Sequence, residues 1–112
     1  NRFMDRSWFF LLLAIILEVL GTTSMKMSEG FTKLVPSILL FVFYGLGFVF
    51  ITLALRKIDL SITYAIWSGL GTALISIIGV FLFKETATTL KFFSIMLIII
   101  GVIGLNIGNR VQ

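Results

Sequence analysis

Four long hydrophobic stretches dominate the sequence and leave little chain outside them. They cover residues 7–25, 34–55, 60–83 and 92–109, and together they hold one charged residue, Glu18. An α-helix of about 20 residues crosses the hydrocarbon core of a bilayer and satisfies its own backbone hydrogen bonds. The sequence therefore predicts an all-α membrane protein with a single four-helix transmembrane domain over residues 1–112. Its helices are expected at about 7–25, 34–55, 60–83 and 91–109.

The composition supports a membrane location and excludes several classes of function. Of the 112 residues, 59% are hydrophobic and only 12% are charged, whereas soluble domains have about 25% charged residues. The chain has no His and no Cys, so it lacks the usual parts of metal sites and of nucleophilic catalysis. No enzyme activity, metal or cofactor is expected. The nine Lys and Arg are scattered, which argues against nucleic-acid binding and favours contact with lipid headgroups.

Because the polar connections are short, consecutive helices are expected to be antiparallel neighbours. The basic residues in these connections then indicate the orientation of the chain in the membrane. Gly30, Asp59 and the threonines of 86–89 suit helix ends. The side that holds both termini and the second connection has five basic residues, and the other side has four. Such a balance predicts weak orientation and insertion in both directions, although Arg56 and Lys57 together are an alternative determinant of one orientation. The first stretch contains Glu18 and lacks an A-x-A-like cleavage site, which favours a span over a signal peptide.

Glu18 is the most informative residue, because it is the only charged residue within a predicted span. A carboxylate at the centre of a spanning helix costs about 2.5–3.5 kcal/mol on insertion scales, and such residues usually face a protein interior or a water-filled cavity. Desolvation disfavours the charged form, so Glu18 is expected to hold either a proton or a cation. A carboxylate that binds either a proton or a cation, but not both, is sufficient for an exchanger. A neutral carboxylic acid that hydrogen-bonds between helices is the structural alternative.

Several residues share the helical face of Glu18 and are candidates for a binding site. The small residues near the carboxylate allow a ligand or another helix to approach, and Thr22 is placed to donate a hydrogen bond to Glu18. The candidates on this face are Leu11, Ala14, Ile15, Gly21 and Thr22.

Aromatic residues in the second and third spans add a site for organic cations. Tyr64, Trp67 and Ser68 belong to the segment YAIWSGLG, and Tyr44 lies deep in the second span, where its hydroxyl needs a partner. Aromatic rings beside a carboxylate bind organic cations through π faces and charge. An interfacial aromatic belt is the alternative for Tyr64 and Trp67.

Small residues in the last two spans predict flexibility and helix packing. Gly69 and Gly71 lie in the middle of the third span, where they permit a hinge or simply close helix packing. The last span carries a stripe of small residues that predicts a dimer interface. The stripe consists of Ser94, Gly101, Gly104 and Gly108.

These motifs together resemble the small multidrug resistance transporters. The resemblance rests on GTTSMK after a mid-span Glu, SEGFTKLVPS in the first connection and YAIWSGLG in the third span, in order and at family spacing. It implies an antiparallel, dual-topology homodimer in the bacterial inner membrane that exports cations in exchange for protons by alternating access. Glu18 would then be the shared proton and substrate site, with Tyr44, Tyr64 and Trp67 at the aromatic binding positions. Gly69 and Gly71 would be the hinge, and Ser94 replaces the more usual Gly of the dimer stripe.

The resemblance also distinguishes two branches of the family. Guanidinium exporters usually have a Trp just after the mid-span Glu and a Ser in the second helix, whereas this chain has Gly21 and Gly47 at the matching positions. This difference favours the multidrug branch, which handles hydrophobic quaternary ammonium compounds. A guanidinium exporter, a non-transporting membrane partner subunit and a cation channel are the competing functions. A multidrug exporter of this kind is expected to use the proton gradient as its energy source and to need no cofactor.

Overall fold

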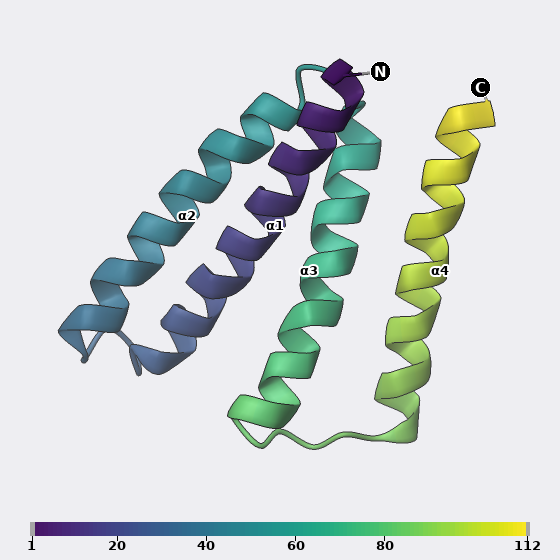
Figure 1. Cartoon of the computed structure of the whole chain (residues 1–112). Helices are drawn as coiled ribbons and strands as arrows, with labels where there is room; N and C mark the ends of the chain where they lie inside the picture. Colours follow the sequence, from purple (N-terminus) through teal and green to yellow (C-terminus); the bar gives the residue numbers. More distant parts are fainter. Residues whose placement is uncertain (1, 112) are drawn as a thin grey trace.

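The computed structural model of the chain describes residues 2–111, with side chains described for residues 6–108, and its regular elements are α-helices. The helices are α1 (Arg2–Met27), α2 (Leu34–Ala54), α3 (Leu60–Leu82) and α4 (Thr89–Val111), as Figure 1 shows. The four predicted helices are confirmed, and their bounds agree within two residues except at the start of α1. There α1 begins at Arg2, ahead of the predicted start at about 7, so the helix extends beyond the hydrophobic stretch.

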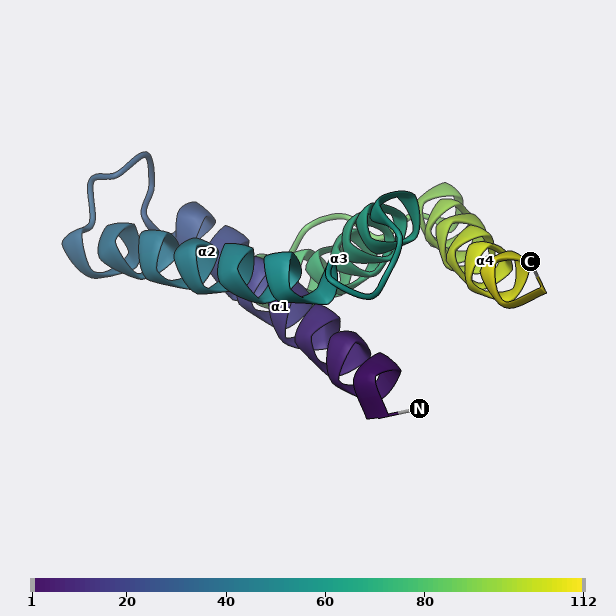
Figure 2. The same ribbon diagram turned by 90° about the horizontal axis from the view of Figure 1, so that it is seen from above.

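The helices form a flat row, with extents of 47 × 35 × 18 Å. α1 packs extensively against α2 and also contacts α3, and α3 contacts α4. Viewed from above, α4 lies at one edge of the row, with α3 between it and the α1–α2 pair (Figure 2). The chain by itself therefore leaves the outer side of α4 open.

The two ends of the bundle carry different connections. The start of α1 and the end of α4 lie at the same end of the bundle as the connection from α2 to α3, and the other two connections lie at the opposite end (Figure 1). This arrangement agrees with the predicted grouping of both termini and the second connection on one side.

The packed core lies where α1 meets α3 and the end of α2. Helices in lipid associate mainly through van der Waals packing, so small residues that permit close approach are important. Gly47 is one such residue, because a Cβ there would lie 3.5 Å from the Cβ of Leu17 and 3.6 Å from the carbonyl oxygen of Ala14. The core residues are Leu11, Ile15, Val19, Ala54, Ile58, Ile62 and Ile66.

The connections use the residues that the sequence indicated. After α1, the backbone adopts positive φ at Glu29, Gly30 and Phe31, with values of 48°, 72° and 69°; only Gly adopts such values without steric cost. Before α4, the Lys91 N–H donates to Thr88 Oγ1 at 3.0 Å. Thr88 is therefore the N-cap of α4, which confirms the cap predicted within 86–89.

The outer surface of the bundle is strongly apolar. All four helices are long and apolar enough to cross a membrane, and no residue of the most hydrophobic part of α4 is buried within the protomer. Large exposed apolar surfaces are unfavourable in water. The chain is accordingly a multi-pass membrane protein whose α4 is covered by lipid or by another protein.

Candidate functional site

The carboxylate of Glu18 lies in the middle of α1 and accepts a hydrogen bond from its own helix. Thr22 Oγ1 donates to Glu18 Oε1 at 3.0 Å, which confirms the predicted hydrogen bond. The hydroxyl of Tyr44 on α2 is also hydrogen-bonded to Thr22 Oγ1. Because a hydroxyl has a single proton, and Thr22 uses its proton for Glu18, Tyr44 donates to Thr22. The hydrogen bonds therefore run in one direction, from Tyr44 through Thr22 to the carboxylate.

Two glycines make room for this arrangement. A Cβ at Gly21 would lie 3.3 Å from three ring carbons of Tyr44, and a Cβ at Gly71 would lie 3.1 Å from Glu18 Oε2. Such contacts are tighter than side chains normally adopt. Gly21 thus allows the Tyr44 ring to cross α1, and Gly71 allows α3 to approach the second carboxylate oxygen.

A small cavity opens between α1 and α3 beside this carboxylate. It has a volume of about 170 Å³. Its walls combine the Glu18 carboxylate with an indole ring, two hydroxyls and an aliphatic side chain, so it can bind a positively charged group. The lining residues are Glu18, Trp67, Ser68, Gly71, Thr72 and Ile75.

The aromatic residues are arranged along α3 and α2 near the cavity. The rings of Tyr64 and Trp67 are 5.7 Å apart between centroids and inclined at 46°. Trp67 is partly buried in the cavity wall, whereas Tyr64 has 62% of its surface exposed. Ser68 donates its hydroxyl to the carbonyl of Tyr64 at 2.8 Å, so its oxygen is accessible to a ligand mainly as an acceptor.

Other predicted residues of the Glu18 face occupy different surroundings in the protomer. Leu11 and Ile15 are 1% exposed and belong to the packed core. Ala14 is fully buried, and its carbonyl oxygen faces Gly47 of α2. Within the protomer these three residues position α1 and do not line the cavity.

The predicted hinge glycines both lie at close helix contacts. α3 runs as one helix through Gly69 and Gly71. A Cβ at Gly69 would lie 2.5 Å from Val102 Cγ2 and 3.2 Å from Ile98 Cγ2. Gly69 therefore permits the close contact between α3 and α4. The hinge at Gly69 and Gly71 stays a prediction.

The predicted dimer stripe lies on an open part of α4. Ser94 is exposed, and a Cβ at Gly101, Gly104 or Gly108 would meet no atom within 4 Å. The three glycines line a hollow of about 540 Å³ between α3 and α4. Their surface is thus free to accept another helix.

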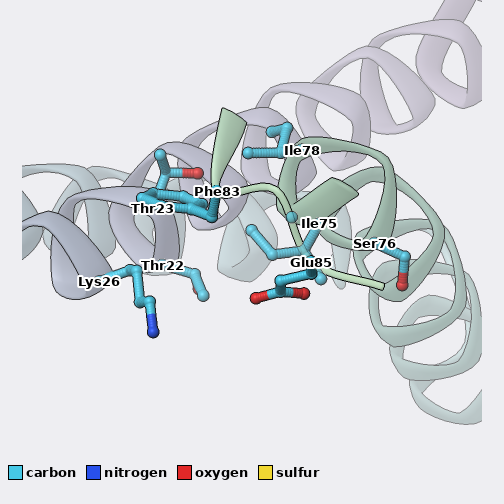
Figure 3. Close-up of a pocket in the computed structure, with 9 residues that line it drawn as sticks. Thr22, Thr23, Lys26, Ile75, Ser76, Ile78, Phe83 and Glu85 are labelled. Atoms are coloured by element: carbon cyan, nitrogen blue, oxygen red, sulfur yellow. The ribbon is translucent and has the colours of Figure 1, made fainter. Parts of the chain in front are cut away.

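Sequence reasoning missed Thr72, Ile75 and a second cavity. The spacing of positions 64, 68, 72 and 75 along one helical face extends the predicted aromatic face to both residues. The second cavity has a volume of about 230 Å³ and lies between α1, α3 and the connection after α3. Figure 3 shows Lys26 and Thr22 on its α1 side and the Glu85 carboxylate near Ile75.

Thr22 and Ile75 relate the second cavity to the first. Ile75 lines both cavities, and Thr22, which lines the second, is hydrogen-bonded to Glu18 in the first. Glu85 Oε1 lies 3.8 Å from Lys91 Nζ and packs against Gly79. The second cavity therefore lies close to the Glu18 site, on the side of the connection after α3.

The described residues contain no group of three or more His, Cys, Asp or Glu side chains placed to hold a metal ion.

Comparison with known proteins gives consistent matches. Residues 6–98 match the family model described as Small Multidrug Resistance protein. The chain is 54% identical over 105 residues to the uncharacterized membrane protein YvaE of Bacillus subtilis, which covers 94% of this chain and 88% of that protein. It is 46% identical over 101 residues to the multidrug resistance protein EbrB of Bacillus subtilis, covering 90% and 86% of the two chains.

A third relative is the quaternary ammonium compound-resistance protein QacE of Escherichia coli. It is 41% identical over 105 residues, which cover 94% of this chain and 96% of that protein. The family match includes the complete Glu18–Thr22–Tyr44 arrangement and the α3 wall of the cavity. The chain therefore belongs to the small multidrug resistance family, as the resemblance of its motifs predicted.

Proposed function

We propose that the protein is a proton-coupled antiporter in the bacterial plasma membrane that exports hydrophobic, aromatic and quaternary ammonium cations. The observation that carries the proposal is the Glu18 carboxylate, hydrogen-bonded by Thr22 and open to a cavity walled by Trp67. The names of EbrB and QacE, which refer to multidrug and quaternary ammonium resistance, support this substrate class.

Competition at Glu18 provides the coupling. In the charged state the carboxylate accepts from Thr22 and attracts a cation, and in the protonated state it is neutral and releases the cation. Because one charge cannot be neutralised by both partners at once, substrate binding expels the proton and proton binding expels the substrate. The direction of the Tyr44–Thr22–Glu18 hydrogen bonds stabilises the charged state before the cation arrives.

Aromatic side chains are expected to contribute to the affinity for organic cations without requiring one fixed orientation of the substrate. A cation over the face of a Trp gains about 0.5–2 kcal/mol, and more when it is desolvated. Gly47 places no polar group near Glu18, and the nearest atoms to a Cβ there belong to α1. A site with few fixed polar groups selects by charge and stacking, which favours bulky organic cations over guanidinium.

The size of the cavity supports a dimeric transport unit. Sites for drug-sized ligands measure about 300–1,000 Å³, whereas the cavity beside Glu18 measures about 170 Å³. A second protomer that brought its own Glu18 to the open side of this cavity would enlarge the site. We infer an antiparallel homodimer from this and from the level charges of the connections, and alternating access then follows from exchange of the two orientations.

The proposal is tested by the affinity of the purified protein for tetraphenylphosphonium and guanidinium between about pH 5 and 9. Tetraphenylphosphonium is expected to bind, and its affinity is expected to fall as pH falls, by up to about tenfold per pH unit for a single competing proton. Glu18→Gln should abolish this pH dependence and proton-driven uptake into proteoliposomes. Glu29→Gln, which removes an exposed carboxylate paired with Lys33 at 3.5 Å, is the matched control and should retain both.

The alternative functions give different results in the same experiment. Binding of guanidinium alone would assign the chain to the guanidinium branch. Binding of neither cation at any pH would support a partner subunit or a paired heterodimer, and cation currents without proton coupling would support a channel. Proton-driven uptake by the Glu18→Gln variant would contradict the mechanism.

A further inference from the structure

The α3 wall of the cavity beside Glu18 carries two hydroxyl groups, those of Ser68 and Thr72. Gly71 lies between them in the sequence, and a Cβ there would lie 3.1 Å from Glu18 Oε2. Residues three and four apart share one face of a helix. The two hydroxyls therefore belong to the face of α3 that lies against the carboxylate.

The proton of each hydroxyl is already used within α3. Ser68 donates to the carbonyl oxygen of Tyr64 at 2.8 Å, and Thr72 donates to the carbonyl oxygen of Ser68 at 2.7 Å. A hydroxyl has one proton and two acceptor lone pairs, so toward a ligand each of these oxygens is an acceptor. The ionised carboxylate of Glu18 is also an acceptor only. The cavity thus offers three acceptor groups, one from α1 and two from α3.

Three neighbouring acceptors match the three N–H donors of a primary ammonium group. Each acceptor lies about 2.9 Å from the nitrogen, so two acceptors of one ammonium group can be up to about 6 Å apart. The Cβ atoms of residues four apart on a helix are about 5–6 Å apart, which allows Ser68 and Thr72 to bind the same nitrogen. A quaternary ammonium group has no N–H and leaves both hydroxyl oxygens without a donor, which is unfavourable once they are desolvated.

We propose that this cavity selects cations whose charged nitrogen carries N–H donors, and that its preferred substrates are protonated primary amines with an aromatic body. The inference rests on the proposed function and specifies the substrate class of the same site. Trp67 in the cavity wall supplies a π face for the aromatic body. Quaternary ammonium compounds bind through charge and stacking, without using Ser68 and Thr72.

The test compares naphthylmethylammonium with its N,N,N-trimethyl analogue, which has the same charge and aromatic body but no N–H donor. The dissociation constant of each cation from the purified full chain is measured by equilibrium dialysis, at one pH at which both cations are charged. Thr72→Val and Ser68→Ala each remove one acceptor. Each is expected to weaken binding of the primary ammonium about tenfold relative to the trimethyl analogue, because hydrogen bonds to charged groups are strong. Equal changes for the two cations would overturn the proposal.

Two further variants separate the role of the oxygen from changes in helix packing. Thr72→Ser keeps the hydroxyl oxygen and should retain most of the preference for the primary ammonium. Thr52→Val is the matched control, because Thr52 is exposed on α2 and donates in the same way to the carbonyl oxygen of Phe48, at 2.7 Å. It should leave the preference unchanged. A loss in Thr72→Ser or in Thr52→Val as large as in Thr72→Val would contradict a role for the Thr72 oxygen.

Glu18→Gln distinguishes a failure of this inference from a failure of the proposed function. If this variant weakens binding of the trimethyl analogue, while the hydroxyl variants affect both cations equally, the site at Glu18 stands and the selectivity for N–H donors is wrong. If neither cation binds the unchanged protein, or if Glu18→Gln leaves the binding of both unaltered, the proposed function and this inference both fail.

Discussion

Gly71 of α3 faces the second carboxylate oxygen of Glu18 so closely that a Cβ at position 71 would lie 3.1 Å from Oε2. The first oxygen accepts the hydrogen bond from Thr22. The carboxylate is thus held on one side by a donor and bounded on the other by the bare backbone of a helix. This arrangement leaves little freedom for Glu18 within the protomer.

Gly71→Ala is therefore expected to displace the Glu18 carboxylate by a few tenths of an ångström and to weaken tetraphenylphosphonium binding several-fold, and Gly71→Val should weaken it further. Equilibrium dialysis at fixed pH measures the effect. Gly45→Ala is the matched control, since a Cβ at Gly45 meets no atom within 4 Å. Full affinity in the Gly71→Val variant would show that the carboxylate moves freely on binding.

Tyr44 is expected to act on Glu18 through Thr22, as a positioning residue. Thr22→Val should weaken cation binding about tenfold or more, because hydrogen bonds to charged groups contribute about 1.5–3 kcal/mol. Tyr44→Phe should weaken it less, and the double variant should resemble Thr22→Val alone. This non-additivity, measured as a double-mutant cycle on the dissociation constant, reports the coupling. Additive losses would mean that Tyr44 contacts the cation independently.

Trp67→Ala is expected to narrow the range of substrates without unfolding the protein. Loss of the π face should weaken the binding of aromatic cations by about 2- to 30-fold, while a small aliphatic cation such as tetrapropylammonium should lose less. The Trp67→Phe variant keeps an aromatic face, so its affinity for aromatic cations should lie between those of the unchanged protein and of Trp67→Ala. An unchanged range in Trp67→Ala would place Trp67 in an interfacial aromatic belt.

Gly69 offers a test of packing against flexibility. Gly69→Ala should destabilise the protein, because the new Cβ would lie 2.5 Å from Val102 Cγ2. Adding Val102→Ala removes that methyl group and should restore most of the thermal stability in detergent. If transport returns together with stability, Gly69 serves packing. If stability returns and transport does not, the flexibility of α3 at Gly69 is required.

Some residues of the site could be predicted from the sequence and others could not. Glu18 and its hydrogen bond to Thr22 could be predicted, because both lie on one helical face and a charge within a span is conspicuous. The donation from Tyr44 could not, because it depends on which side of α2 faces α1. Leu11 and Ile15 share the same helical face as Glu18, yet they are packed in the core. One face of a long helix contacts different surroundings along its length, so sharing a face does not place two residues in one site.

The sequence by itself determined the number of helices, most of their bounds and the single charge within the hydrophobic stretches. Hydropathy and length suffice for this, because a spanning helix satisfies its backbone within its own segment. Only the tertiary structure decided which sides of the helices meet, and hence that Tyr44 reaches Thr22 and that Gly71 bounds Glu18. Helices that are apolar on all sides carry little information about orientation, so packing between small residues determines their partners.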